Sequence, residues 1–96
     1  MTLHPQVAAL AAQLEDLSVF LRMQGDRLWS ARVELCRHLV ADSNFAGVER
    51  FLRLFEGEDN LGNLAWADAA ATARLRDLVK AARTLADRLV REEGVD

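Results

Sequence analysis

The chain has 96 residues, a formal net charge of −3 and a single proline, and it is rich in the strong helix formers alanine, leucine and arginine. At this length only one compact core can form, so we expect a single domain over residues 1–96. Hydrophobic residues make up 51% of the chain and charged residues 28%, which is typical of a folded protein. The net negative charge argues against a nucleic-acid-binding protein, because such proteins carry a basic surface that neutralises phosphates.

Few residues bear on the compartment or on a cofactor. The single cysteine, Cys36, cannot form an intramolecular disulfide, and residues 1–5 lack the features of a signal peptide, so we expect a cytoplasmic protein. Charges recur every few positions, so no run approaches the roughly 18 apolar residues that cross a bilayer. His4 is far from His38 in the sequence, and Cys36 would point away from His38 on a helix. We therefore expect no metal site and no cofactor.

Residues 5–23 and 27–41 have the apolar spacing of two helices. In the first helix, apolar residues recur at three- and four-residue steps and form one stripe, which consists of Val7, Leu10, Leu14, Leu17 and Leu21. Pro5 suits the first turn, where a backbone N–H is not needed. Gly25 can end this helix in the left-handed conformation, and Asp26 can cap the next one.

The helix expected over residues 27–41 has two apolar lines instead of one, so we expect it to be the central helix of the bundle. The two lines consist of Leu28, Leu35 and Leu39, and of Trp29, Val33, Cys36 and Val40. Arg32 falls between them. Because a guanidinium there needs a carboxylate or a route to water, we expect Arg32 to form a structural ion pair.

A third helix is expected over residues 44–55, after a turn at residues 42–44 whose side chains can cap it. Its inward-facing residues supply most of the aromatic core and are Phe45, Val48, Phe51, Leu52 and Phe55. Residues 57–63 then break the periodicity with two glycines and two asparagines, which indicates a loop that Leu61 pins to the core.

A long last helix is expected over about residues 65–93, and Gly94 is expected to end it. Its stripe contains small residues that let a neighbouring helix approach, and consists of Leu75, Leu78, Ala82, Leu85 and Leu89. The sequence therefore predicts an all-α fold, an irregular bundle of about four helices of which the last is long.

Catalytic, calcium, phosphate and DNA-binding sites are all disfavoured by spacing. No pair of titratable residues has a spacing that suits general acid-base chemistry, so we expect no catalytic residue and no enzyme. Gly57 and Gly62 have the separation of a phosphate-binding loop, but no Lys-Ser or Lys-Thr follows and the segment is acidic. The acids there also miss the spacing of a calcium loop. Arg50 and Arg53 follow a short turn between helices, as in a helix-turn-helix, but no basic face surrounds them.

Charge is unevenly distributed along the chain. Residues 1–55 contain six arginines and six acids, and residues 69–96 contain six basic and five acidic residues. Residues 56–68, called the acidic segment below, carry four acids and no base. Helix N-termini favour acids, which is the simpler explanation. The alternative is that the segment meets a basic surface of a partner protein, through Glu56, Glu58, Asp59, Asn60, Trp66 and Asp68.

Trp66 lies near the expected start of the last helix. In a helix that begins at residue 65, it would project roughly opposite the stripe that contains Leu75 and Leu89. We therefore expect the bundle core to leave Trp66 uncovered, so that it can insert into a partner. The alternative is that the preceding loop or the first helix folds over it.

Four short stretches within residues 25–65 resemble a family of short helical bacterial proteins of unassigned function. They are Gly25-Asp-Arg-Leu-Trp29, Asn44-Phe-Ala-Gly-Val48, Leu52-Arg-Leu-Phe55-Glu-Gly57 and Leu61-Gly-Asn-Leu64. The resemblance implies a Trp-bearing helix, a Gly-containing helix and a Gly-rich knuckle that ends in an apolar-Asn-Asp-like turn. It also implies an accessory or immunity-type protein encoded near bacterial toxin genes. At the knuckle this chain differs, because Glu58, Asp59 and Asn60 replace a small Gly-Met-Gly-Ser-like run.

These observations predict a small cytoplasmic bacterial protein-binding module, most specifically an immunity protein or inhibitor that blocks a partner through its acidic segment. Acidic clusters resemble the polyanions that partners such as nucleases bind, and they speed association by electrostatic steering. The alternative is a structural or regulatory helical module without catalytic activity. It would form a homodimer through the surface around Trp66 or the Ala-rich face of the last helix.

Overall fold

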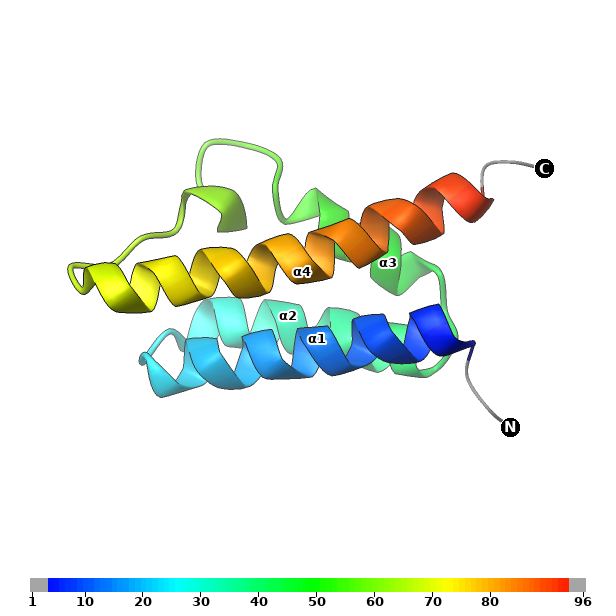
Figure 1. The fold of residues 1–96 in the computed structure, drawn as a ribbon, viewed down its shortest axis with the longest axis horizontal. Coiled ribbons are helices and arrows are strands. Elements are labelled where there is room, and N and C mark those ends of the chain that lie inside the picture. Colours follow the sequence, from blue (N-terminus) through cyan, green and yellow to red (C-terminus); the bar gives the residue numbers. More distant parts are fainter. Residues whose placement is uncertain (1–3, 94–96) are drawn as a thin grey trace.

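The computed structural model describes residues 4–93, the side chain of Glu93 excepted, as four α-helices and one short 3-10 helix (Figure 1). They are α1 (Pro5–Met23), α2 (Arg27–Ala41), α3 (Ala46–Arg53), η1 (Leu61–Asn63) and α4 (Ala69–Glu93). The predicted all-α bundle with a long last helix is confirmed. The third helix is shorter than expected, and the last begins at residue 69 instead of 65. Gly94, expected to end α4, lies outside the described residues.

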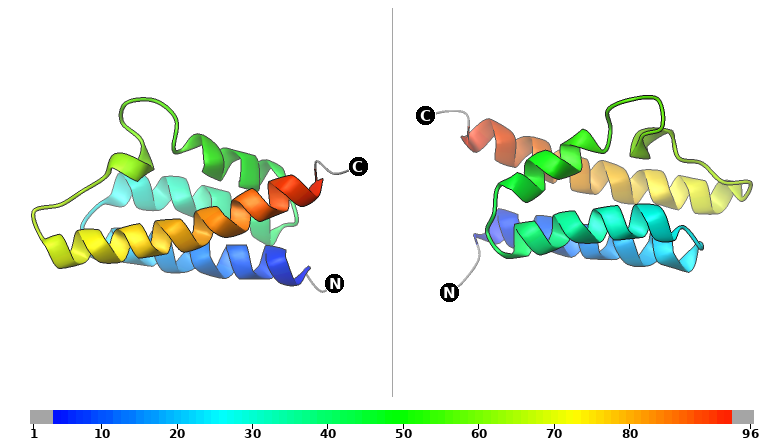
Figure 2. Two further views of the ribbon diagram at one scale, coloured as in Figure 1. Left: turned by 45° about the horizontal axis from the view of Figure 1, so that its top comes forward. Right: turned by 180° about the vertical axis from the view of Figure 1, so that it is seen from behind.

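The helices form a closed ring, in which each packs closely against two neighbours in the order α1, α2, α3, α4 and back to α1. The first turn of α1 and the last turns of α4 lie at the same end of the molecule (Figure 1). The left view of Figure 2 shows η1 beside the first turns of α2, and residues of both line one groove. No helix is therefore surrounded by the others, and the expectation that residues 27–41 form a central helix is wrong.

Helix α1 provides the most regular part of the core. Its leucine stripe is buried without residual exposure and consists of Leu10, Leu14, Leu17 and Leu21. Pro5 occupies the first turn, and Gly25 follows the helix with a φ of 87°. Asp26 then caps α2, because its Oδ1 accepts a hydrogen bond of 3.0 Å from the backbone N–H of Trp29. These three local predictions are confirmed.

Helix α2 buries only one of its two predicted apolar lines. Val33 and Cys36 are fully buried, whereas Leu28 and Leu35 are 59% and 45% exposed. The expectation that the leucine line faces the core is therefore wrong for these two residues. Because α2 has close neighbours only on the sides of α1 and α3, its outer face has no helix to cover it.

Two contacts fix the rotation of α2. Ser18 of α1 and Ser30 of α2 are both buried, and each hydroxyl lies within hydrogen-bond distance of the other residue's carbonyl oxygen, at 3.2 and 2.9 Å. On the next side, Gly47 of α3 sits so close to α2 that an added Cβ would lie 2.7 Å from the Leu39 Cβ and 2.8 Å from the Val40 nitrogen. Both contacts turn the small and β-branched residues of α2 inward.

Helix α3 and the loop after it close the core from the remaining side. Val48 and Phe51 are buried, and Phe55 packs edge-on against Phe51 with ring centroids 5.3 Å apart. Phe45 is only partly buried. Leu61 of η1 is 1% exposed, which confirms that it pins the loop to the core.

Candidate functional site

The acidic segment begins with a loop that its own amide side chains hold in shape. Gly57 has a φ of 84°, a conformation that glycine adopts without strain. The Asn60 side chain donates to the Gly57 carbonyl at 2.7 Å and accepts from the Asn63 N–H at 3.2 Å. The Asn63 side chain donates to the Glu58 carbonyl at 3.1 Å. With Leu61 buried below, this network fixes the backbone that carries the acids.

Three carboxylates project from this loop into solvent. Glu56, Glu58 and Asp59 are all exposed. Within residues 4–93, none of the three forms an ion pair. Their charges are therefore available to a partner, and their backbone is already ordered by hydrogen bonds.

A groove of about 390 Å³ separates this loop from the start of α2. It is lined by Leu28, Trp29 and Arg32 on α2 and by Asp59, Asn60, Asn63, Leu64 and Ala65 on the other side. Two of the predicted partner-binding residues, Asp59 and Asn60, thus share a groove with exposed residues of α2.

Arg32 lies over the face of Trp29 in this groove, with its guanidinium carbon 4.8 Å from the ring centroid. No carboxylate of the described chain lies within ion-pair distance of it, so the predicted structural ion pair is wrong. Exposure explains the difference, because the guanidinium reaches water and the ring supplies a cation-π contact.

Trp66 and Asp68 serve the start of α4. The Trp66 ring packs against Phe20 of α1, with centroids 6.0 Å apart, and is partly buried against the core. The expectation of an uncovered Trp66 is therefore wrong, and the alternative, in which the first helix folds over it, is confirmed. Because α4 begins at Ala69, Trp66 lies in the segment before the helix, where helical geometry does not set its direction.

Hydrogen bonds tie the segment before α4 to the helix. The Trp66 N–H donates to the Thr72 hydroxyl at 2.9 Å, and Asp68 accepts from the Ala71 N–H at 3.0 Å. Asp68 therefore caps α4, and for this one acid the helix-start explanation holds.

Leu28 and Leu35 are surface residues that sequence reasoning placed in the core. The sequence contained one signal, because Ser30 lies on the same helix as two competing apolar lines. A buried serine needs a hydrogen-bond partner, and here Ser18 of the neighbouring helix supplies it. The pairing of the two serines, together with the close approach of Gly47, determines which line faces inward.

The other side of the loop faces basic residues of α4. Arg76, Lys80 and Arg83 line a second groove of about 280 Å³ together with Phe55, Leu61, Gly62 and Leu64. The Arg83 guanidinium lies over the Phe55 ring, 4.5 Å from its centroid, and reaches Asp87 at 4.0 Å. The loop thus has a basic neighbour on the α4 side, whereas its other side faces α2.

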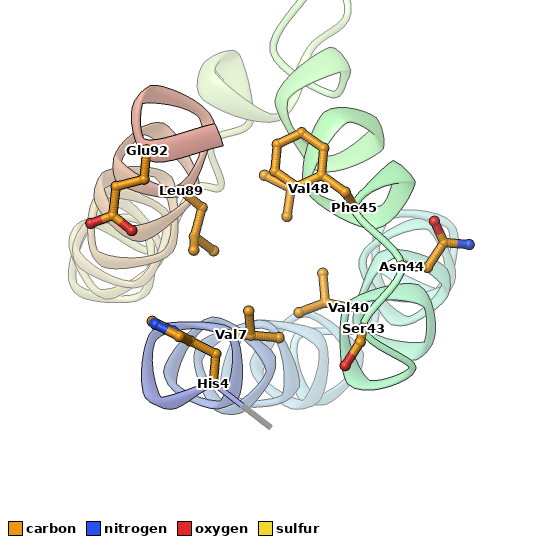
Figure 3. Close-up of a pocket in the computed structure, with 9 residues that line it drawn as sticks. All are labelled: His4, Val7, Val40, Ser43, Asn44, Phe45, Val48, Leu89 and Glu92. Atoms are coloured by element: carbon orange, nitrogen blue, oxygen red, sulfur yellow. The ribbon is translucent and has the colours of Figure 1, made fainter. Parts of the chain in front are cut away.

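A hollow of about 490 Å³ opens at the end of the ring where α1 begins and α4 ends (Figure 3). Its apolar lining consists of Val7, Val40, Phe45, Val48 and Leu89, and its polar residues are His4, Ser43, Asn44 and Glu92. His4 Nδ1 accepts from the Gln6 N–H at 3.2 Å, and Glu92 accepts from the Gln6 side chain at 3.1 Å. Two of the polar residues therefore already cap α1 or join it to α4.

Titratable groups with a shifted pKa lie on or in α2. Burial raises the pKa of the Cys36 thiol to about 11, so the thiol stays protonated at neutral pH. The Arg37 Nε–H donates a hydrogen bond of 2.8 Å to Glu34 Oε1, and this bond lowers the pKa of Glu34. Among the described residues, no three His, Cys, Asp or Glu side chains are grouped so as to hold a metal ion.

Comparison with protein-family models, with curated proteins and with solved structures found no match for this chain. The resemblance to immunity-type bacterial proteins therefore stays a prediction. No helix in the part of the chain that the structure describes has the length and apolar character to cross a membrane.

Proposed function

We propose that this protein is a small bacterial, cytoplasmic protein-binding module without catalytic activity, most specifically an immunity-type inhibitor that covers a basic surface of its partner. One observation carries the proposal. Glu56, Glu58 and Asp59 are exposed, form no ion pair within residues 4–93, and stand on a loop that hydrogen bonds and a buried leucine hold in shape.

The geometry suits tight binding for two physical reasons. A loop that is ordered before binding loses less conformational entropy when a partner docks. Unpaired carboxylates on such a loop attract a basic surface from a distance and speed association, an effect that salt weakens. Toxins that act on nucleic acid bind it through a basic surface. An acidic module can therefore block such a toxin by occupying the surface that binds the nucleic acid.

A second candidate function is a structural or regulatory homodimer. The exposed Leu28 and Leu35 of α2 favour it, because apolar side chains of this size at a surface often mark an interface. The surface around Trp66 does not, since α1 covers that ring.

The experiment that separates these functions uses two variants with the same change in charge. Glu58→Lys with Asp59→Lys reverses two acids of the loop, and Glu15→Lys with Asp16→Lys reverses two exposed acids of α1. The wild type and both variants are immobilised, and partners are captured from a lysate of the organism that makes the protein. Circular dichroism verifies that each variant keeps its helix content.

We expect a specific protein to bind the wild type and the α1 variant but not the loop variant, with an association rate that falls as salt rises. Equal capture by all three proteins would contradict the proposal. Recovery of the chain itself, with sedimentation showing a concentration-dependent dimer, would support the homodimer in its place.

A further inference from the structure

The outer face of α2 carries a short apolar strip that the rest of the described chain covers only in part. Leu28 and Leu35 are 59% and 45% exposed, and a separation of seven residues places them two turns apart on one side. Ala31, which is also exposed, lies between them on that side. The ring of helices explains the exposure, because α2 has its close neighbours on two other sides.

This face is continuous with the groove beside the acidic segment. Leu28 belongs to both, since it also lines the groove with Trp29 and Leu64. Asp59 lines the far wall, and Glu58 next to it is exposed. Arg32 lines the α2 wall of the same groove, so the apolar strip along α2 is bordered on this side by one arginine and, across the groove, by the carboxylates of the loop.

We infer that this surface receives a single amphipathic helix of the partner protein, with apolar residues over Leu28 and Leu35 and lysines or arginines toward Glu58 and Asp59. The inference rests on the proposed function and states the form of the partner. Apolar residues two turns apart are matched by a helix that lies along α2, because its own side chains recur at the same spacing. The carboxylates determine which flank of that helix is basic.

A second copy of the chain fits this surface less well. It would bring the Arg27 and Arg32 side chains of two α2 helices to one interface, where like charges oppose association. A partner helix adds no second copy of Arg27 and Arg32, and bases on its flank over the loop pair with Glu58 and Asp59, which outnumber Arg32 there.

Site-specific photo-cross-linking tests the inference. The probe is p-benzoylphenylalanine, placed at Leu35, at Glu58 or, as a control, at the exposed Ala12 of α1, in the full chain produced in host cells. After irradiation, mass spectrometry identifies the cross-linked segment of the partner. We expect the probes at Leu35 and Glu58 to reach one segment with apolar residues at helical spacing and flanking bases, and the probe at Ala12 not to reach it.

The same segment, made as a synthetic peptide, gives the second measurement. A variant with Leu28→Ala and Leu35→Ala should bind it roughly tenfold more weakly or worse, as for side chains at the centre of an interface. Equal binding by wild type and variant would overturn the inference.

Each other result of the cross-linking has a defined meaning. Cross-links from Glu58 without any from Leu35 would overturn the helix inference and leave the proposed function intact. Cross-links from Leu35 to a second copy would make this face a self-association surface, which also overturns the inference. If neither probe reaches a partner, the proposed function fails together with it.

Discussion

The leucines of α1 and α2 have similar helical spacing and opposite surroundings. Those of α1 are fully buried, whereas Leu28 and Leu35 of α2 are 59% and 45% exposed. In α1 the leucines are one continuous stripe, so hydrophobic burial alone determines the rotation of that helix. In α2 two stripes compete, and the smaller residues Val33 and Cys36 occupy the core. The inward face of α2 is therefore selected by close packing and by polar pairing, and not by apolar area.

The largest expected effect is the difference in stability lost when one leucine of α1 or one leucine of α2 is replaced by alanine. Leu14→Ala removes a fully buried side chain and should lower the free energy of unfolding by about 2–5 kcal/mol. Leu35→Ala removes a side chain that is 45% exposed and should lower it by only about 1 kcal/mol. Urea denaturation of both variants measures the difference, and similar losses of stability would contradict the outward orientation of Leu35.

The close approach of α3 to α2 should be nearly as sensitive. In Gly47→Ala, the new Cβ would meet the Leu39 Cβ at 2.7 Å and the Cys36 carbonyl oxygen at 2.9 Å, so the helices must separate. We expect a loss of roughly 1–3 kcal/mol, although alanine favours a helix over glycine by about 1 kcal/mol. Thermal unfolding measures the effect, with Ala46→Ser at the exposed neighbouring position as the control. A gain in stability would show that the two helices separate at no cost.

The serine pair should contribute less. Ser30→Ala removes the hydrogen bond of 2.9 Å to the Ser18 carbonyl and should cost about 1 kcal/mol. Exchange of amide hydrogens in α1 and α2 should quicken to a matching degree. If Ser30→Ala leaves stability unchanged, the pairing does not fix the rotation of α2, and the packing at Gly47 alone must do so.

The last effect is absent at neutral pH and appears only at high pH. Because burial raises the pKa of Cys36 to about 11, the unfolded chain loses this proton at lower pH than the folded chain does. The buried neutral thiol makes its full contribution to the free energy of unfolding below about pH 8.5. As the pH rises from there toward the pKa of Cys36 in the folded chain, that free energy should fall by up to about 1.4 kcal/mol per pH unit. The Cys36→Ala variant should lack this part of the slope in denaturation between pH 8 and 11. Identical slopes would place the thiol in contact with water.

The sequence was sufficient to predict the local structure where a single physical signal dominates. The leucine stripe of α1, the Asp26 cap and the buried Leu61 all follow from spacing or from one side chain near one backbone group. The exposure of Leu28 did not follow, because it depends on the pairing of two serines twelve residues apart in the sequence. Tertiary contacts of this kind leave no periodicity in the sequence.

The acidic segment divides in the same way. The charge of the segment can be read from the sequence, but the role of each of its residues cannot. Asp68 turned out to cap α4, and Trp66 was covered by α1, because the helix begins four residues later than its apolar pattern indicates. Asp59 and Asn60 line a groove whose other wall is α2, a helix that is remote from them in the sequence.

The two tryptophans give the protein a pair of separate optical probes. Trp66 lies against Phe20 at the packed start of α4, so its emission should follow the loss of tertiary structure. Trp29 lies beneath a guanidinium in an open groove, so its emission should respond to whatever displaces Arg32. A Trp66→Phe variant would therefore leave a chain whose remaining indole senses occupancy of the α2 surface, while unfolding is followed separately by the helical signal in circular dichroism.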